Sequence, residues 1–343
     1  MKIKPLEIVK AVATIVFFLS LLYLFLFTER FAPLRELVLP TPTVVYESLP
    51  RFDENEEPYY QPITPSPYTE INTFRDIVAW NNYPDENSLL LSGNTLLIAG
   101  YIEDENKSYE GRTSVDLVTG DINTGQVYWQ ARVGGNILAT DGKYVFAETI
   151  TDGFDPVGIT AYDLASGEIT WQTTFEWWYA LGVEFMVVRS PVLLVNTFNK
   201  GNSASYKLDL ETGDLIETNH DRLHSKELVL DGLVFSKEDY DRVGPIVTIQ
   251  DNDGSFVWRY NQSVVSNIAI GGPVTYFVTQ DAELVAVDTM TGDVLGSLSF
   301  TPAFPEDFDF WNNHIIVAAN GDTVAVYFRD KRQLSLFHFE NGL

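Results

Sequence analysis

Most of the chain beyond residue 88 is a succession of short apolar runs, each separated from the next by a polar turn. Runs rich in β-branched and aromatic residues occur at 143–147, 191–195, 233–235, 274–278 and 314–318. The residues that follow the turns alternate between apolar and polar, as the residues of a half-buried strand do. This pattern predicts an all-β domain built from many short strands.

The turns share one motif: Asp, two variable residues, Thr or Ser, Gly, a polar residue, an apolar residue and, in the best copies, Trp two residues later. Asp can hydrogen-bond its own backbone two residues on, Gly accepts a positive φ, and Trp offers a large apolar surface. We therefore interpret these aspartates as turn formers rather than as catalytic or metal-binding carboxylates. The structural turn residues are Asp121, Gly125, Trp129, Asp163, Gly167, Trp171, Asp209, Gly213, Asp251, Gly254, Trp258, Asp288 and Gly292.

The motif recurs about every 42 residues, which accommodates four short strands and their turns, or one blade of a β-propeller. We expect six blades, or seven if residues 71–88 and their surroundings form one. Propellers commonly close by pairing a strand from one terminus with strands from the other, so residues 71–80 are predicted to pair with the last blade. The six expected blades are about 89–133, 135–175, 178–219, 224–261, 263–300 and 308–343.

The repeat resembles that of quinoprotein-type β-propellers, whose units are called PQQ-like repeats. The resemblance is carried by residues 121–129 and 163–171, and by the Asp-Gly pairs at 141–142 and 231–232. The chain departs from it at Glu217 and Gly296, where Trp would stand. The resemblance implies a propeller fold, and the family includes redox enzymes, outer-membrane assembly scaffolds and other extracytoplasmic proteins.

The N-terminal region predicts a membrane anchor. Residues 11–27 form an uncharged apolar run, at the short end of the roughly 17–25 residues that span a bilayer as a helix. No small-x-small site follows, which favours an uncleaved signal anchor over a cleaved signal peptide. Lysines within residues 1–10 predict a cytoplasmic N-terminus and an extracytoplasmic propeller. Residues 28–70, rich in proline and acids, are predicted to be a linker, and residues 71–343 the propeller.

The composition of the chain limits which partners it can bind and which catalytic or metal chemistry it can support. The chain has 22 basic and 48 acidic residues, for a net charge of −26, which argues against nucleic-acid binding. It has no cysteine, which excludes disulfides, thiolate metal sites and a Cys nucleophile. Residues 251–254 resemble the start of a calcium loop, but Gln262 stands where the closing Glu belongs, and we interpret them as a turn. No metal site or cofactor is predicted, and weak attraction for Ca²⁺ stays open.

Two further groups of residues are candidate sites. His220 and His224 have a spacing that suits a metal on a helix, but their surroundings lack a helical pattern and a third strong ligand, so we assign them to a connector. Two aromatic stretches lie at predicted blade junctions, where rings either wedge sheets together or form a partner surface. The candidate binding surface consists of Trp177, Trp178, Tyr179, Phe308 and Trp311.

These features together predict a non-enzymatic, membrane-anchored extracytoplasmic propeller that acts as a protein- or ligand-binding scaffold at the cell envelope. Two alternatives stay open. A quinoprotein-type oxidoreductase is permitted by the resemblance, although the chain lacks the vicinal Cys pair and matched site residues, so PQQ is not predicted. A glycan-binding or glycan-cleaving propeller would need two carboxylates flanking a pocket.

Overall fold

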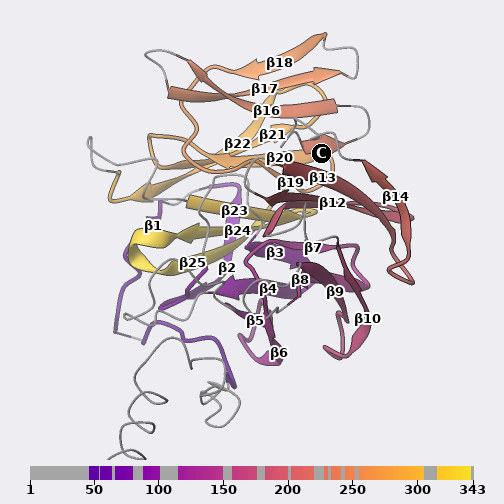
Figure 1. Ribbon diagram of the computed structural model, residues 1–343. Coiled ribbons are helices and arrows are strands. Elements are labelled where there is room, and N and C mark those ends of the chain that lie inside the picture. The colour runs from indigo at the N-terminus through magenta and orange to yellow at the C-terminus, as the bar shows by residue number, and fades with distance from the viewer. Residues whose placement is uncertain are drawn as a thin grey trace, which may run out of the picture. The chain divides into compact units, whose positions relative to one another are not determined.

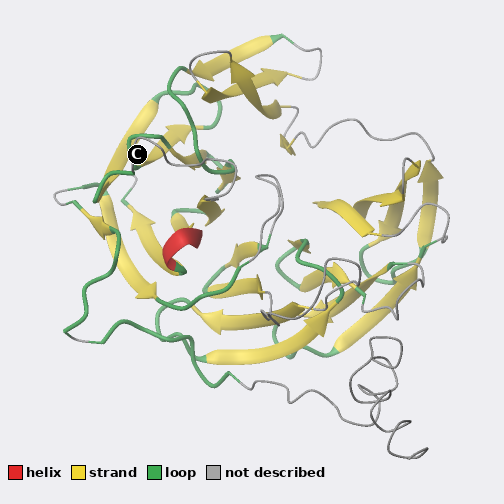
Figure 2. Ribbon diagram, turned by 60° about the vertical axis from the view of Figure 1, so that its left-hand side comes forward, coloured by secondary structure: helices red, strands yellow, loops and turns green. Residues whose placement is uncertain are grey.

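The described part of the structure is almost entirely strand. In this computed structural model, one compact unit runs from Tyr46 to Leu343. Figure 2 shows its strands and one short 3-10 helix, η2 (Arg329–Lys331). No helix in the described part is long and apolar enough to cross a membrane, and the predicted segments 1–10 and 11–27 lie outside it. The described residues are 46–53, 55–63, 66–79, 88–100, 115–149, 157–175, 182–199, 202–219, 228–230, 233–240, 244–251, 255–304 and 315–340.

The described strands form six antiparallel sheets, numbered here as blades 1 to 6 in chain order (Figure 1). The predicted all-β class and the four-stranded repeat are confirmed. Blade 1 contains β3 (Leu89–Ser92), β4 (Thr95–Gly100), β5 (Val115–Asp121) and β6 (Val127–Val133); blade 2 contains β7 (Leu138–Thr140), β8 (Tyr144–Glu148), β9 (Gly158–Asp163) and β10 (Ile169–Thr174); blade 3 contains β11 (Gly182–Arg189), β12 (Val192–Asn199), β13 (Asn202–Asp209) and β14 (Leu215–Asn219).

Blade 4 contains β15 (Leu228–Leu230), β16 (Leu233–Tyr240), β17 (Gly244–Asp251) and β18 (Phe256–Tyr260); blade 5 contains β19 (Ala269–Ile270), β20 (Val274–Val278), β21 (Glu283–Asp288), β22 (Val294–Thr301) and, on its outer side, β1 (Gln61–Pro62); blade 6 contains β23 (Ile315–Asn320), β24 (Thr323–Phe328), β25 (Gln333–Phe339) and β2 (Tyr68–Phe74). First strands contact first strands of neighbouring blades, as β3 does with β7 and β23. The fourth strand of each blade is therefore its outer strand.

The last blade takes its outer strand from the N-terminal side of the domain, as predicted. β2 pairs antiparallel with β25, from Tyr68 opposite Phe339 to Phe74 opposite Leu334. The strand begins and ends earlier than the predicted segment 71–80. It ends at Phe74 because the chain turns there, and Asp76 has a positive φ of 55°.

The residues just before β2 pack against the blades, which differs from the predicted free linker at 28–70. Leu49 is buried between blades 6 and 1, and Tyr60 and Tyr68 are buried between blades 5 and 6. The Tyr60 backbone N–H donates to the Gln333 side chain, and the Gln333 amide donates back to the Tyr60 carbonyl. The compact unit therefore begins at Tyr46 rather than at residue 71.

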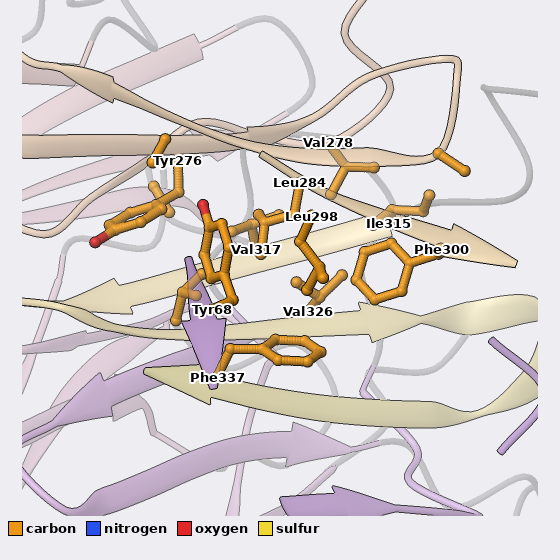
Figure 3. Close-up of a cluster of buried hydrophobic side chains, with 14 of the residues drawn as sticks. Tyr68, Tyr276, Val278, Leu284, Leu298, Phe300, Ile315, Val317, Val326 and Phe337 are labelled. Carbon is orange, nitrogen blue, oxygen red and sulfur yellow. The ribbon is translucent and has the colours of Figure 1, made fainter. Parts of the chain in front are cut away.

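The core lies between neighbouring blades, so most blades bury both faces. All five residues of β20 are buried, which explains its continuous apolar run. Figure 3 shows the core between blades 5 and 6, where Tyr68 of β2 lies among Tyr276, Val317 and Phe337. The closing strand thus contributes apolar surface as well as backbone hydrogen bonds.

Candidate functional site

The repeated turn uses its aspartate as a local hydrogen-bond acceptor. Asp163 Oδ1 accepts from the Ala165 N–H at 3.1 Å, the Ser166 N–H at 2.8 Å and the Ser166 hydroxyl at 2.9 Å. The hydrogen bonds from Ser166 hold the pKa of the Asp163 carboxyl below its ordinary value. Gly167, with a φ of +74°, closes the turn. Asp121, Asp209 and Asp288 accept the same backbone bonds.

A β-bulge follows each of these turns and orients the residue in the Trp position. In blade 2 the register between β9 and β10 shifts between Ile169 and Trp171. Equivalent shifts occur in blades 1, 3, 4 and 5. A bulge adds a residue to one strand and re-aims the side chains after it.

The Trp side chain joins its blade to the turn of the next blade. Trp171 Nε1 donates to the Leu210 carbonyl at 2.9 Å, and its ring lies on Gly213, where an added Cβ would be under 3.0 Å from Trp171 Cε3. Trp129 bonds Leu164 and covers Gly167 in the same way. Trp258 likewise bonds the Thr289 carbonyl and covers Gly292.

At the other contacts between neighbouring blades, residues other than Trp take its place. Phe74 of β2 covers Gly125 of blade 1, where a Cβ would be 2.7 Å from its ring. At Gly296, Pro67 and Phe339 fill the space. In blade 3 the residue is Glu217, whose side chain is 66% exposed and lies 3.9 Å from Lys207 Nζ. Blade 3 therefore lacks the aromatic side chain that joins blades 1, 2 and 4 to their neighbours.

The residues from Tyr46 onward cover parts of the outer strands of blades 1 and 5 and supply the outer strand of blade 6. The Val127 N–H of β6 donates to the Glu47 carbonyl, and the Leu49 N–H donates to the Gly125 carbonyl. β1 pairs with β22, and the Ile63 N–H extends this pairing to the Ser299 carbonyl. Strand β2 covers β25.

The outer strands of blades 2, 3 and 4 have no strand on their outer side within the described ranges (Figure 1). They expose apolar side chains just after the turn: Ile169 is 56% exposed, Ile216 53% and Phe256 58%. We call β10, β14 and β18 the open edges, and they form the candidate site. The open edges were not predicted as a site, because apolar residues two or three positions after the turn Gly also occur in blades whose outer strands are covered, as at Val294.

The predicted aromatic binding surface falls on residues that the structure does not describe. Trp177, Trp178, Tyr179, Phe308 and Trp311 all lie outside the described residues. The same holds for Gly254, for the side chain of Asp251, and for His220 and His224. Among the residues that the structure describes, no group of three or more His, Cys, Asp or Glu is arranged to hold a metal ion.

One buried carboxylate lies apart from the turns. Asp116 of β5 stands opposite Arg132 of β6, and its Oδ2 has no hydrogen-bond partner within the described part of the chain. Burial raises the pKa of the Asp116 carboxyl, and the Arg132 guanidinium offsets part of this effect. Burial and the nearby Asp116 carboxylate also raise the pKa of Tyr46.

Asparagine at position 116 is expected to stabilise the protein at neutral pH. Because the folded chain binds the Asp116 proton more tightly than the unfolded chain, stability falls as pH rises from about 3.9 through the raised pKa. Asp116→Asn cannot ionise and should lack this loss. Denaturant midpoints from about pH 4 to pH 8 would show a smaller decline in the variant. A variant less stable than the wild type at pH 7 would contradict this.

Comparison with known families identifies the repeat. The family model described as "Outer membrane protein assembly factor BamB" matches residues 113–306, which is more than half of the chain. The chain belongs to this family. The predicted PQQ-like repeat is thereby confirmed, and the sheets are the blades of a BamB-type β-propeller. No curated protein sequence matches the chain.

Three solved structures that are similar to this chain have low sequence identity to it. A chain of the mitotic checkpoint complex is 10% identical, with a TM-score of 0.52 over 79% of this chain and 95% of that chain. BamB from Moraxella catarrhalis is 12% identical, with a TM-score of 0.35 over 79% of this chain and 100% of that chain. The Cps50 (Swd1) β-propeller domain of Myceliophteria thermophila is 11% identical, with a TM-score of 0.45 over 80% of this chain and 99% of that chain.

Proposed function

We propose that this BamB-family propeller is a protein-binding scaffold of the cell envelope. The observation that carries the proposal is the set of exposed apolar side chains on the open edges β10, β14 and β18. Unpaired strand edges present backbone donors and acceptors, and exposed apolar groups beside them favour association with another chain. The family's description as an assembly factor supports a role in holding other proteins together.

The same proposal includes the membrane topology. Residues 11–27 would anchor the chain as one helix, with residues 1–10 in the cytoplasm and the propeller outside. Since the described propeller begins at Tyr46, residues 28–45 would be the remaining linker. The net charge of −26 suits a soluble domain that does not bind anionic lipid or nucleic acid.

Lysines on the open edges should abolish partner binding. The test compares the wild type with a combined Ile169→Lys, Ile216→Lys and Phe256→Lys variant, both full-length and recovered from membranes after proximity labelling. Hot-spot side chains at the centre of an interface contribute roughly 2 kcal/mol or more each, so a variant that replaces them should lose the partners. Lysine is tolerated on exposed edges, and circular dichroism would verify the fold.

A matched control separates the open edges from general surface charge. Met290 and Ile63 are similarly exposed, at 58% and 50%, but lie outside the open edges. Met290→Lys with Ile63→Lys should keep the labelled proteins found with the wild type. Identical sets for all three folded proteins would refute the proposed role of the open edges.

A further inference from the structure

Blade 3 differs from the other blades with open edges in how its outer strand is held. We infer that β14 accepts an extended strand of the partner, and that this strand alternates aliphatic with basic side chains. The inference rests on the proposed function, because it names the partner segment for one of the open edges. Three features of β14 carry it: its exposure, its missing joint and its charge.

The first feature is the exposure of β14 along its length. Four of its five residues are exposed, and Leu215 and Ile216 are each 53% exposed. The bulge between Leu215 and Glu217 places these two neighbouring aliphatic side chains at the start of the strand. In both β10 and β18 the third residue of the strand is a buried Trp, whereas the third residue of β14 is the exposed Glu217.

The second feature is that blade 3 lacks the Trp that contacts the following blade, because Glu217 stands in the Trp position. Trp171 and Trp258 bond the turn of the following blade and so hold β10 and β18 on that side. Glu217, in the same repeat position, is exposed and interacts with Lys207 of its own blade. Within the described residues, β14 pairs with β13 from Ser205 opposite Asn219 to Leu208 opposite Leu215.

The protein itself shows how such an edge is completed. β1 adds to β22 as an antiparallel strand, with Gln61 opposite Thr301 and Pro62 opposite Phe300. β2 adds to β25 over seven residues. In an antiparallel pair the outer strand directs alternate backbone groups away from its neighbour, and an added strand satisfies them. β14 has the same fourth-strand position as β22 and has no such covering strand among the described residues.

Charge defines the partner strand. Asp214 and Glu217 flank the exposed pair Leu215 and Ile216, and Glu211 lies in the adjoining turn. Lys143 pairs with Glu211 at 2.7 Å, and Lys207 approaches Glu217 at 3.9 Å. Because Lys143 already compensates Glu211, the exposed Asp214 and Glu217 are the carboxylates that attract basic side chains and repel acidic ones in this chain of net charge −26. Successive side chains of a strand point to opposite faces. The aliphatic side chains of the partner strand would therefore share one face, where they contact Leu215 and Ile216, and its basic side chains would share the other.

Residue-by-residue photocrosslinking tests the strand. p-Benzoylphenylalanine is placed in full-length protein, in membranes, at 215, 216, 217 or 218 in turn, and at 281 as a remote control. The crosslinked partner residues are mapped by mass spectrometry. We expect them to advance along one partner segment that alternates aliphatic with Lys or Arg. Attachment points spaced three to four residues apart, an acidic segment, or no crosslink from β14 would overturn the inference.

The mapped segment, as a synthetic peptide, then tests the charge. Asp214→Lys with Glu217→Lys should weaken its binding by about tenfold or more, since close charge pairs across interfaces are worth roughly 1.5 kcal/mol or more. Asp281→Lys, at an exposed position on blade 5, should leave binding unchanged. Equal weakening by both variants would overturn the inference. If partners were captured through β10 or β18 but not through β14, the inference of a partner strand on β14 would be refuted, and the scaffold proposal would stand.

Discussion

Alanine at position 213 is expected to destabilise the protein by about 2–5 kcal/mol, because two costs add at this one position. Gly213 has a φ of +72°, and a side chain in this left-handed conformation costs roughly 1–2 kcal/mol. The added Cβ would also stand under 3.0 Å from the Trp171 ring. Displacing a packed ring of this kind costs about 1–3 kcal/mol. Urea unfolding followed by circular dichroism measures the loss.

Gly272 provides a matched control for the conformational cost alone. Its φ is +92°, but a Cβ there would have no heavy atom within 4 Å. Gly272→Ala should therefore show only the left-handed penalty of roughly 1–2 kcal/mol. In a Trp171→Ala background, Gly213→Ala should fall to the same small value. If Gly213→Ala and Gly272→Ala were equally destabilising in the wild type, the contact between Trp171 and Gly213 would not contribute to stability.

A chain that begins at Ile77 is expected not to fold cooperatively. It lacks β1 and β2, and with them Tyr60, Tyr68 and Phe74, all of which are buried. Removing a buried aromatic side chain costs about 3–5 kcal/mol, and a whole domain is stable by only about 5–15 kcal/mol. The truncation also exposes the backbone edge of β25. Circular dichroism and size-exclusion chromatography would detect the loss of the fold and the resulting aggregation.

Two other truncations locate the effect. A chain that begins at Tyr46 retains the whole compact unit and should unfold like the full-length protein. A chain that begins at Ser66 retains β2 but lacks β1 and Tyr60, so its stability should be intermediate. A cooperative transition at the wild-type midpoint for the chain beginning at Ile77 would show that β2 is dispensable for closure.

The repeated turn could be predicted from the sequence because its chemistry is local. Asp163 bonds the backbone two and three residues on, and Gly167 supplies the positive φ within the same turn. No distant residue is needed for either. The four-stranded repeat followed from the spacing of these turns, and it is the feature that the family match confirms.

Residues 46–63 were wrongly assigned to the linker because their contacts are distant in sequence. Their prolines and acids indicate an extended chain, and this is correct for β1, which is an extended pair of residues. The buried position of Tyr60 depends instead on Gln333, 273 residues away. Composition within residues 28–70 carries no information about such a partner, so the start of the domain at Tyr46 could not be predicted.

The amino-acid sequence by itself determined the all-β class, the repeat and its turns, because Asp, Gly and alternating apolar residues act within a few positions of one another. Only the tertiary structure decided that the Trp of one repeat lies on the Gly of the next, and which outer strands the N-terminal residues cover. Those outcomes depend on the path of the chain between blades. The open edge of β14 depends on sequence and tertiary structure together. The sequence shows that Glu217 stands in the Trp position, but only the structure shows that Trp171 and Trp258 contact the following blade from that position.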